Sequence, residues 1–267
     1  MNFRQLHQGP DLLKIANCWD AGSAVLVQSL GVPALATTSA GLAWALGYAD
    51  GNHLPIAEHA AAVARIARVA RVPLSVDSEA GYSDDPATVA DNVMKIVEAG
   101  AAGVNLEDGA GAPALLCRKI EAIKAAATRA GVDVFVNARC DVWLKGLAKG
   151  REVDETLLRA RDYAAANADG LFAAGVTAAA DIEALVGGQP LPLNVMARPG
   201  MPGLDELQRL GVRRISAGSA IAEAAWGRAL RAATGFLAEG AGAELFEGAA
   251  PYPQINGALN AANAAQG

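Results

Sequence analysis

Short apolar runs rich in β-branched residues alternate along this sequence with longer, alanine-rich stretches whose apolar positions recur with helical spacing. We expect strands at Leu13–Asn17, Ala34–Ser39, Leu74–Ser78, Gly103–Glu107, Val134–Arg139, Gly170–Ala173, Leu193–Ala197 and Arg214–Ala217. We expect helices near Ala21–Leu30, Ile56–Arg71, Pro86–Ala99, Ala114–Ala130, Asp154–Asn167, Ala178–Val186, Leu204–Leu210 and Ala220–Gly235. Strands that alternate with helices in this way are typical of βαβ units built around a parallel sheet.

Glycines mark several junctions where an expected helix passes into a strand. Leu30-Gly31-Val32-Pro33 and Leu210-Gly211-Val212-Arg213 each place a glycine where the helix needs a left-handed residue to stop. Eight strands and eight helices in alternation predict an α/β fold, the (β/α)8 or TIM barrel, with extra C-terminal helices. An open doubly wound sheet is the alternative, although no GxGxxG motif follows the first strand.

The chain beyond Gly240 departs from this alternation. We expect residues 1–240 to form the barrel, as the catalytic domain, and residues 241–267 to form a helical tail. Pro251-Tyr252-Pro253 predicts a stiff joint within the tail. The apolar residues of the tail need a surface to cover, so the tail either swaps onto a neighbouring subunit or folds back on its own barrel.

Composition and charge exclude several classes of protein. The 267 residues carry 22 Lys and Arg against 28 Asp and Glu, with no basic stripe, so a nucleic-acid partner is not expected. The uncharged stretch between Asp20 and Asp50 has the length of a membrane span, but Gly31 and Pro33 interrupt it, so no membrane partner is expected either. Three cysteines without CxxC spacing, and no signal-peptide pattern, indicate a protein of the reducing cytoplasm.

Charged side chains gather where the expected strands end. The third strand leads into Asp77 and Glu79, the fourth ends at Glu107 and the fifth at Arg139, while Asp50 lies in the loop after the second. Side chains two apart on a strand share a face, and the C-terminal strand ends of a barrel surround its active site. We therefore expect these five side chains at the mouth of the barrel.

Carboxylates crowded into a confined mouth repel one another unless a cation lies among them. Oxygen-rich sites of this kind suit Mg²⁺ or Mn²⁺, which retain waters and accept a chelating substrate. Arg139 matches a substrate carboxylate through a bidentate fork. The alternative for any one of these carboxylates is a helix cap or a loop ion pair.

Four segments of the sequence, in order, resemble the isocitrate lyase/phosphoenolpyruvate mutase superfamily. They are Thr38-Ser39-Ala40-Gly41-Leu42 with Gly47-Tyr48-Ala49-Asp50, Asp77-Ser78-Glu79-Ala80-Gly81-Tyr82, Asn105-Leu106-Glu107-Asp108-Gly109, and Asn137-Ala138-Arg139-Cys140-Asp141. Arg159-Ala160-Arg161-Asp162-Tyr163 and Gly211-Val212-Arg213-Arg214-Ile215-Ser216 add support. The resemblance runs from about Asn17 to Ala222 and implies a Mg²⁺-dependent barrel that acts on 2-oxo acids or their enol forms.

The resemblance also implies a set of metal-site residues. Asp77 would contact the metal, and Glu79 and Glu107 would assist through water. Asp50 would orient the metal's waters or handle protons. The implied chemistry is bond cleavage beside a carbonyl, in which an enolate is stabilised as its charge develops.

For the substrate, the resemblance assigns Ser39, Ala40 and Gly41 as backbone or hydroxyl donors to one carboxylate. Arg139 would hold the other anionic end, and Asp77 would contact the substrate as well as the metal. The resemblance further implies a homo-oligomer, a dimer or a tetramer with swapped C-terminal helices.

Two departures separate this chain from the carbon–carbon lyases of that superfamily. Their Lys-Lys-Cys-Gly loop after the fourth strand supplies a cysteine acid, whereas the loop here, residues 108–113, contains neither lysine nor cysteine. Cys117 falls in an expected helix and Cys140 has no histidine near it in sequence, so both are interpreted as packed residues. Glu79 stands where many members have aspartate. Activity as a standard isocitrate or methylisocitrate lyase is therefore not expected.

Three functions remain open from the sequence. The first is a Mg²⁺-dependent lyase or hydrolase that cleaves or forms a C–C or P–C bond beside the carbonyl of a small 2-oxo carboxylate, with an oxaloacetate-like or 2-oxoglutarate-like ligand. The second is a barrel that binds or senses a 2-oxo acid without efficient turnover, which the bare loop after Glu107 favours. The third is a phosphate-binding barrel that uses the segment Arg213–Ser219.

Overall fold

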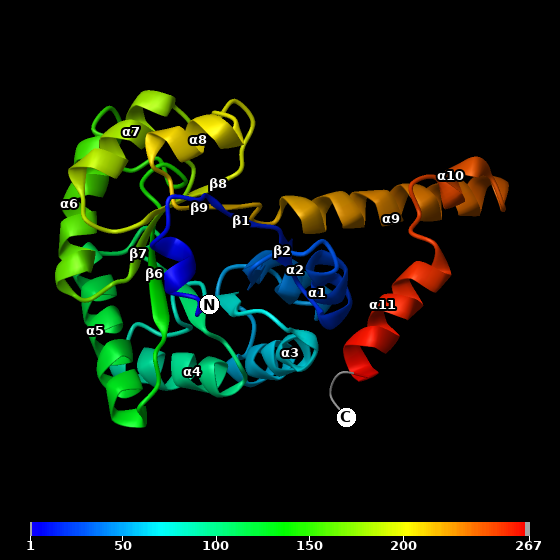
Figure 1. The fold of residues 1–267 in the computed structure, drawn as a ribbon, viewed down its shortest axis with the longest axis horizontal. Helices are drawn as coiled ribbons and strands as arrows, with labels where there is room; N and C mark the ends of the chain where they lie inside the picture. Colours follow the sequence, from blue (N-terminus) through cyan, green and yellow to red (C-terminus); the bar gives the residue numbers. More distant parts are fainter. Residues whose placement is uncertain (1, 265–267) are drawn as a thin grey trace.

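The computed structural model describes residues 2–264 and confirms the barrel (Figure 1). Its strands are β1 Leu13–Ile15, β2 Asn17–Cys18, β3 Leu35–Thr37, β4 Leu74–Asp77, β5 Gly103–Glu107, β6 Phe135–Cys140, β7 Gly170–Ala173, β8 Leu193–Met196 and β9 Arg214–Ser216. All described pairs are parallel, in the order β1-β9-β8-β7-β6-β5-β4-β3-β2.

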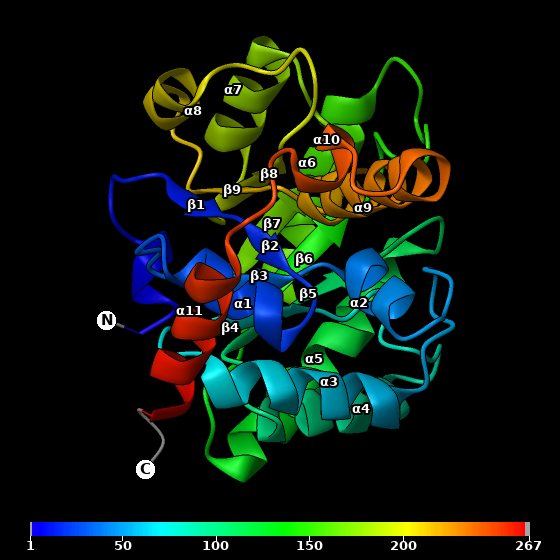
Figure 2. The ribbon, with the colours of Figure 1, turned by 90° about the vertical axis from the view of Figure 1, so that its right-hand side faces the viewer.

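Helices connect these strands and surround the barrel (Figure 2). They are the 3₁₀ turn η1 Gln5–His7, α1 Ala21–Gln28, α2 Ser39–Ala45, α3 Ile56–Val69, α4 Pro86–Glu98, α5 Pro113–Ala130, α6 Glu152–Ala165, α7 Ala179–Gly188, α8 Leu204–Leu210, α9 Ala220–Glu239, α10 Ala243–Phe246 and α11 Tyr252–Ala264. Helix α4 begins as its sequence indicates, since Asp85 caps it by accepting a hydrogen bond from the Thr88 N–H, with Pro86 in its first turn.

The first expected strand is divided in two, which the sequence did not indicate. β1 pairs with β9, and β2 pairs with β3, so the division at Ala16 falls where the sheet closes on itself. β1 and β2 together fill one strand position, so the nine described strands form an eight-stranded barrel. This closure excludes the open doubly wound alternative.

Helix α2 corrects the expectation that a strand reaches Ser39. β3 ends at Thr37, and the helix begins at Ser39. A Cβ atom at Gly41 would lie 2.8 Å from the Thr38 Cγ2 atom and 3.0 Å from the Cβ of Ala222, so only glycine allows this helix to pack so closely. The segment was hidden in the sequence because a seven-residue helix of small residues carries little periodic signal.

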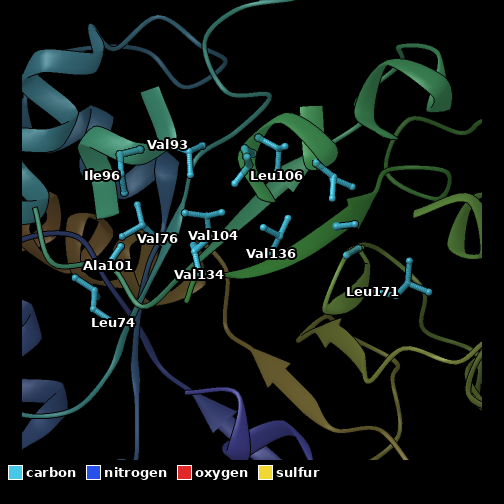
Figure 3. Close-up of a cluster of buried hydrophobic side chains, with 14 of the residues drawn as sticks. Leu74, Val76, Val93, Ile96, Ala101, Val104, Leu106, Val134, Val136 and Leu171 are labelled. Carbon is cyan, nitrogen blue, oxygen red and sulfur yellow. The ribbon is translucent and has the colours of Figure 1, made fainter. Parts of the chain in front are cut away.

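The main hydrophobic core lies between the strands and the outer helices, as Figure 3 shows around β4 and β5. Val76 and Leu106 point outward from these strands and are fully buried with Val93 and Ile96 of α4. Each such burial contributes about 1.5–3 kcal/mol relative to an exposed side chain. Because alternate strand residues face the other way, the inside of the barrel receives a different and more polar set.

The tail beyond the barrel forms helices, as expected. α9 projects away from the barrel and leads to α10, and α11 returns to lie beside α1 (Figures 1 and 2). Arg71 on the loop after α3 donates a hydrogen bond to the Ala261 carbonyl of α11. Among the described residues, no helix combines the length and the apolar character that a membrane crossing requires.

Candidate active site

A cleft opens at the C-terminal ends of the strands. Its lining comes from β2 to β9 and from the loops that follow them, and combines polar and apolar side chains: Asn17, Thr38, Ser39, Ala40, Asp50, Asp77, Asn105, Arg139, Leu144, Phe172, Met196, Ser216, Gly218 and Ser219. The structure thus brings Ser39, Ala40, Asp50, Asp77 and Arg139 together from four separate segments. Their convergence follows from the parallel barrel, which gathers all strand ends on one face.

Asp77, the last residue of β4, has one carboxylate oxygen that accepts a hydrogen bond and one that accepts none from the described residues. Its Oδ2 accepts a hydrogen bond of 3.3 Å from the backbone N–H of Ser39, while its own N–H donates to Thr37 Oγ1 at 2.9 Å. Oδ1 is buried and has no hydrogen-bond partner among the described residues. A buried carboxylate oxygen without a donor is costly, which points to a ligand of positive or hydrogen-bonding character there.

Glu79 does not continue the strand alternation that was expected to place it beside Asp77. β4 ends at Asp77, and Glu79 adopts a left-handed conformation with φ 48°. Its carboxylate is buried and accepts hydrogen bonds from the N–H groups of Gly51 (2.9 Å) and Asn52 and from the Tyr82 hydroxyl (3.1 Å). Burial raises the pKa of Glu79 despite these donors. Glu79 therefore holds the loop that carries Asp50 at the rim and does not line the cleft itself.

Arg139 on β6 lies between two carboxylates. Its Nη1 is 2.6 Å from Glu107 Oε2, and its Nε and Nη2 donate to the two oxygens of Asp141 at 2.6 and 3.1 Å. A guanidinium has five N–H groups, so one remains on Nη1 and one on Nη2. Asp141 occupies the edge formed by Nε and Nη2. The expected bidentate contact with a substrate carboxylate is therefore limited to the end of the guanidinium, formed by Nη1 and Nη2.

The charges around Arg139 change proton affinities in opposite directions. Burial, opposed by Arg139 and assisted by Asp77 and Asp141, raises the pKa of Glu107 to about 8. Burial disfavours the charged form of Arg139, but Glu107 and Asp141 outweigh it and hold the Arg139 pKa above its usual value. Glu107 does not line the cleft and reaches the site through Arg139.

The donor set fits Mg²⁺ or Mn²⁺ in a particular way. No three His, Cys, Asp or Glu side chains within the described part of the chain come close enough to surround a metal ion. Mg²⁺, however, is usually bound by one or two carboxylates, its other positions being filled by waters and substrate. Oδ1 of Asp77 is the free carboxylate oxygen that such a site needs, with Asp50 at the same cleft as an outer carboxylate.

The two ends of the expected donor loop differ in the structure. Ser39 and Ala40 line the cleft at the first turn of α2, where backbone N–H groups have no partner inside the helix. Gly41 does not line the cleft, and instead packs against Thr38, Trp19 and Ala222.

Sequence reasoning missed two groups of cleft residues. The polar ones include Asn17 of β2 and Asn105 in the middle of β5, and Asn105 stands directly opposite Asp77 in the β4–β5 register. The two-residue alternation, counted back from Glu107, would have found Asn105. Leu144, Phe172 and Met196 form the apolar part of the lining and carry no polar signature in the sequence.

Arg214 lies in the segment Arg213–Ser219, which the phosphate-binding alternative uses. It is fully buried inside the barrel, two positions before Ser216 of the cleft. Its three guanidinium nitrogens have no hydrogen-bond partner among the described residues, and its Cζ lies 5.9 Å from the centre of the Phe3 ring. Burial lowers the pKa of Arg214 to about 10, with Asp77 opposing, so the residue stays charged at neutral pH beneath the cleft.

Comparison with known families gives a clear match. The sequence profile of the phosphoenolpyruvate phosphomutase family covers residues 3–237. An oxaloacetate decarboxylase of Ectopseudomonas mendocina is 32% identical over 206 residues, which cover 74% of this chain and 69% of that protein. A Mycobacterium tuberculosis protein of unassigned function is 35% identical over 224 residues, or 82% of each chain.

Solved structures agree with these relatives. A phosphonomutase-type protein from Burkholderia cenocepacia is 42% identical, with a TM-score of 0.82 over 87% of this chain and 97% of that one. A phosphonopyruvate hydrolase, solved with oxalate and Mg²⁺, shares the fold at 21% identity, with a TM-score of 0.83 over 98% of this chain and 97% of that one.

Proposed function

The chain belongs to the phosphoenolpyruvate phosphomutase family, and on that premise we propose that it is a Mg²⁺-dependent enzyme that cleaves a bond beside the carbonyl of a small 2-oxo carboxylate. A C–C bond in an oxaloacetate-like substrate is the leading candidate, and a P–C bond is the second. The relatives named oxaloacetate decarboxylase support the first, and the hydrolase solved with oxalate and Mg²⁺ supports the metal.

The observation that carries this proposal is the uncommitted Oδ1 of Asp77, in the same cleft as the two free N–H groups of Arg139. A divalent cation at Asp77 would be chelated by the carboxylate and carbonyl oxygens of a 2-oxo acid. Arg139 would receive the remote carboxylate. When bound, Mg²⁺ would supply the positive charge that favours an enolate.

The chain's own residues have separate tasks in this proposal. Ser39 presents its hydroxyl, and Ala40 its backbone N–H, from the first turn of α2 to a substrate oxygen, since the Ser39 N–H already donates to Asp77. Asp50, exposed at the rim and held there through Glu79, would accept or return protons when a metal is bound. Leu144, Phe172 and Met196 exclude water from one side of the cleft.

The loop after β5 sets this chain apart from lyases that use a cysteine acid. Residues 108–112 form turns and contain no cysteine or lysine, and Cys117 lies within α5. Cys140 is buried, and burial raises its pKa to about 12, so it supplies no thiolate at neutral pH. We therefore propose a reaction other than isocitrate or methylisocitrate cleavage.

Calorimetric titration tests the proposal directly. Metal-free and Mg²⁺-loaded protein would be titrated with oxaloacetate, 2-oxoglutarate and phosphonopyruvate, and product would be assayed in the same samples. We expect Mg²⁺-dependent binding and turnover of one of them. Binding without product in all three would favour the sensing alternative, and no binding in either state would contradict the site assignment.

Exposed apolar side chains on α9 and on the tail support a homo-oligomer. Leu230, Leu237 and Phe246 are 70%, 83% and 65% exposed in the single chain, and Tyr252 at the start of α11 is 78% exposed. We propose that a neighbouring subunit covers them, because exposed apolar patches of this kind mark interfaces.

Removal of α11 tests this assembly. We expect a chain that ends at Ala250 to shift from dimer or tetramer toward a smaller species in light scattering coupled to size exclusion. The point variant Leu237→Asp, which leaves α11 in place, is expected to shift in the same direction. An unchanged mass in both variants would contradict the proposed interface.

A further inference from the structure

A chain of buried hydrogen bonds runs from Arg139 in the cleft to the outer helix α6. Asp141, whose side chain is fully buried, holds the guanidinium of Arg139 along its side edge. The backbone N–H of Asp141 in turn donates to Asp108 Oδ1 at 2.9 Å. Asp108 Oδ2 accepts from Arg159 Nη1 at 2.8 Å and from the Tyr163 hydroxyl at 2.5 Å.

Asp108 makes hydrogen bonds to the backbone at two points near the end of β6. Its N–H donates to the carbonyl of Arg139 at 3.1 Å, and its carboxylate accepts the N–H of Asp141, two residues further along. Both carboxylate oxygens of Asp108 are occupied and its side chain is fully buried. The backbone on either side of Cys140 is therefore fixed by one carboxylate, and the Arg139 side chain departs from that fixed segment.

Where this chain of hydrogen bonds reaches α6, its residues lie along one face of the helix. Glu155, Arg159 and Tyr163 are spaced by four residues and thus lie on one face of the helix. Glu155 receives the Nε of Arg159 at 2.7 Å, which leaves Nη1 directed at Asp108. Tyr163 is fully buried, so its hydroxyl needs a partner, and Asp108 supplies it.

We propose that Asp108, Arg159 and Tyr163 are positioning residues, which fix the orientation of Arg139 toward the substrate through Asp141. The proposal rests on the proposed function in one respect, that Arg139 receives the carboxylate remote from the metal. With three of its five N–H groups committed, Arg139 offers a substrate only the two at its end, so a small rotation removes the match to a carboxylate.

Tyr163→Phe is the mildest break in this chain, since it removes one hydroxyl and leaves Arg159 on Asp108. We expect KM or Kd for oxaloacetate to rise about tenfold, the usual effect of one lost hydrogen bond to a charged group, with kcat changed less. Affinity for oxalate, which is too short to present a remote carboxylate, is expected to stay within about twofold of wild type. A merely structural role would weaken both ligands equally and would overturn the proposal.

Nuclear magnetic resonance of the Arg139 Nε–H group tests the same chain without a substrate. In the wild-type protein this group is held by Asp141, and we expect its exchange with solvent to accelerate about fivefold or more in Tyr163→Phe and in Arg159→Lys. Unchanged exchange in both variants would overturn the proposal. If wild-type protein binds neither oxaloacetate nor oxalate, the proposed function fails, and the exchange rates alone decide the positioning role.

Arg161 provides the matched control on the same helix. It is exposed on another face of α6 and makes no described contact with Asp108. Arg161→Met is expected to match wild type in the Arg139 exchange rate and in both affinities. An equal change in Arg161→Met and Arg159→Lys would mean that any change in α6 disturbs Arg139, and would contradict the specific chain.

Discussion

An Asp77→Asn variant is expected to lose Mg²⁺-dependent ligand binding and on the order of 10³-fold in kcat/KM, while its melting temperature stays at or above that of the wild type. The substitution conserves shape and removes one negative charge. Oδ1 of Asp77 is the buried carboxylate oxygen that lacks a donor, so the site loses the group that would contact the metal. Stability is retained because the side-chain volume is unchanged and the buried Oδ1, which has no donor, costs free energy in the metal-free protein.

Asp85→Asn is the control for Asp77→Asn. Asp85 is an exposed aspartate that caps α4, and asparagine caps a helix about equally well. We therefore expect wild-type turnover, metal binding and stability in this variant. Calorimetry with Mg²⁺ and oxaloacetate, together with thermal unfolding of all three proteins, gives the comparison. Full turnover in a folded Asp77→Asn protein would exclude the metal site at Asp77.

The order of the elements could be predicted from the sequence because each strand and helix buries a periodic apolar face. That regularity fails in two places, at Ala16 and at α2, and both adjoin the cleft. The division at Ala16 arises from closure of the sheet, which is a long-range event with no local signal. Helix α2 depends on a close approach between Gly41 and Ala222, residues far apart in the chain.

The sequence predicted which residues lie at the candidate site better than it predicted the contacts that they make. Strand ends bring Asp77 and Arg139 to one cleft whatever their partners, so position in the barrel sufficed for both. The partners were not visible, because pairing with Asp141 or with the Gly51 N–H depends on side-chain direction. Glu79 shows the difference, since its left-handed backbone turns its carboxylate to a loop in place of the cleft.

The second large effect concerns stability in acid and involves His59 on α3. His59 is 1% exposed, its ring packs edge-to-face on Tyr82, and neither ring nitrogen has a hydrogen-bond partner among the described residues. Burial lowers the pKa of His59 from 6.5 to about 4, against a smaller opposing effect of Asp77. Between these values the unfolded chain binds a proton that the folded protein refuses, so stability falls as the pH falls from 6.5 to 4.

The size of this effect follows from the shift in the pKa of His59. Each pKa unit corresponds to about 1.4 kcal/mol, so wild type should lose about 3 kcal/mol between pH 7 and pH 4 relative to a variant without the histidine. Glu107, whose pKa is raised to about 8, acts in the opposite direction over part of this range. The measurement must therefore be a difference between variants, since the total pH profile mixes both groups.

His59→Leu is the variant that isolates the effect, with exposed His53→Leu as its control. We expect the free energy of unfolding of His59→Leu, measured with urea, to rise relative to that of wild type by about 3 kcal/mol as the pH is lowered from 7 to 4. For His53→Leu, the difference from wild type should not change with pH. His7 is 5% exposed, and burial together with Arg214 lowers its pKa to about 4. Adding His7→Phe to His59→Leu should therefore raise the free energy of unfolding at pH 4 by a similar amount again. A pH-independent difference between His59→Leu and wild type would contradict this prediction, because it would mean that the pKa of His59 is the same in the folded and unfolded states.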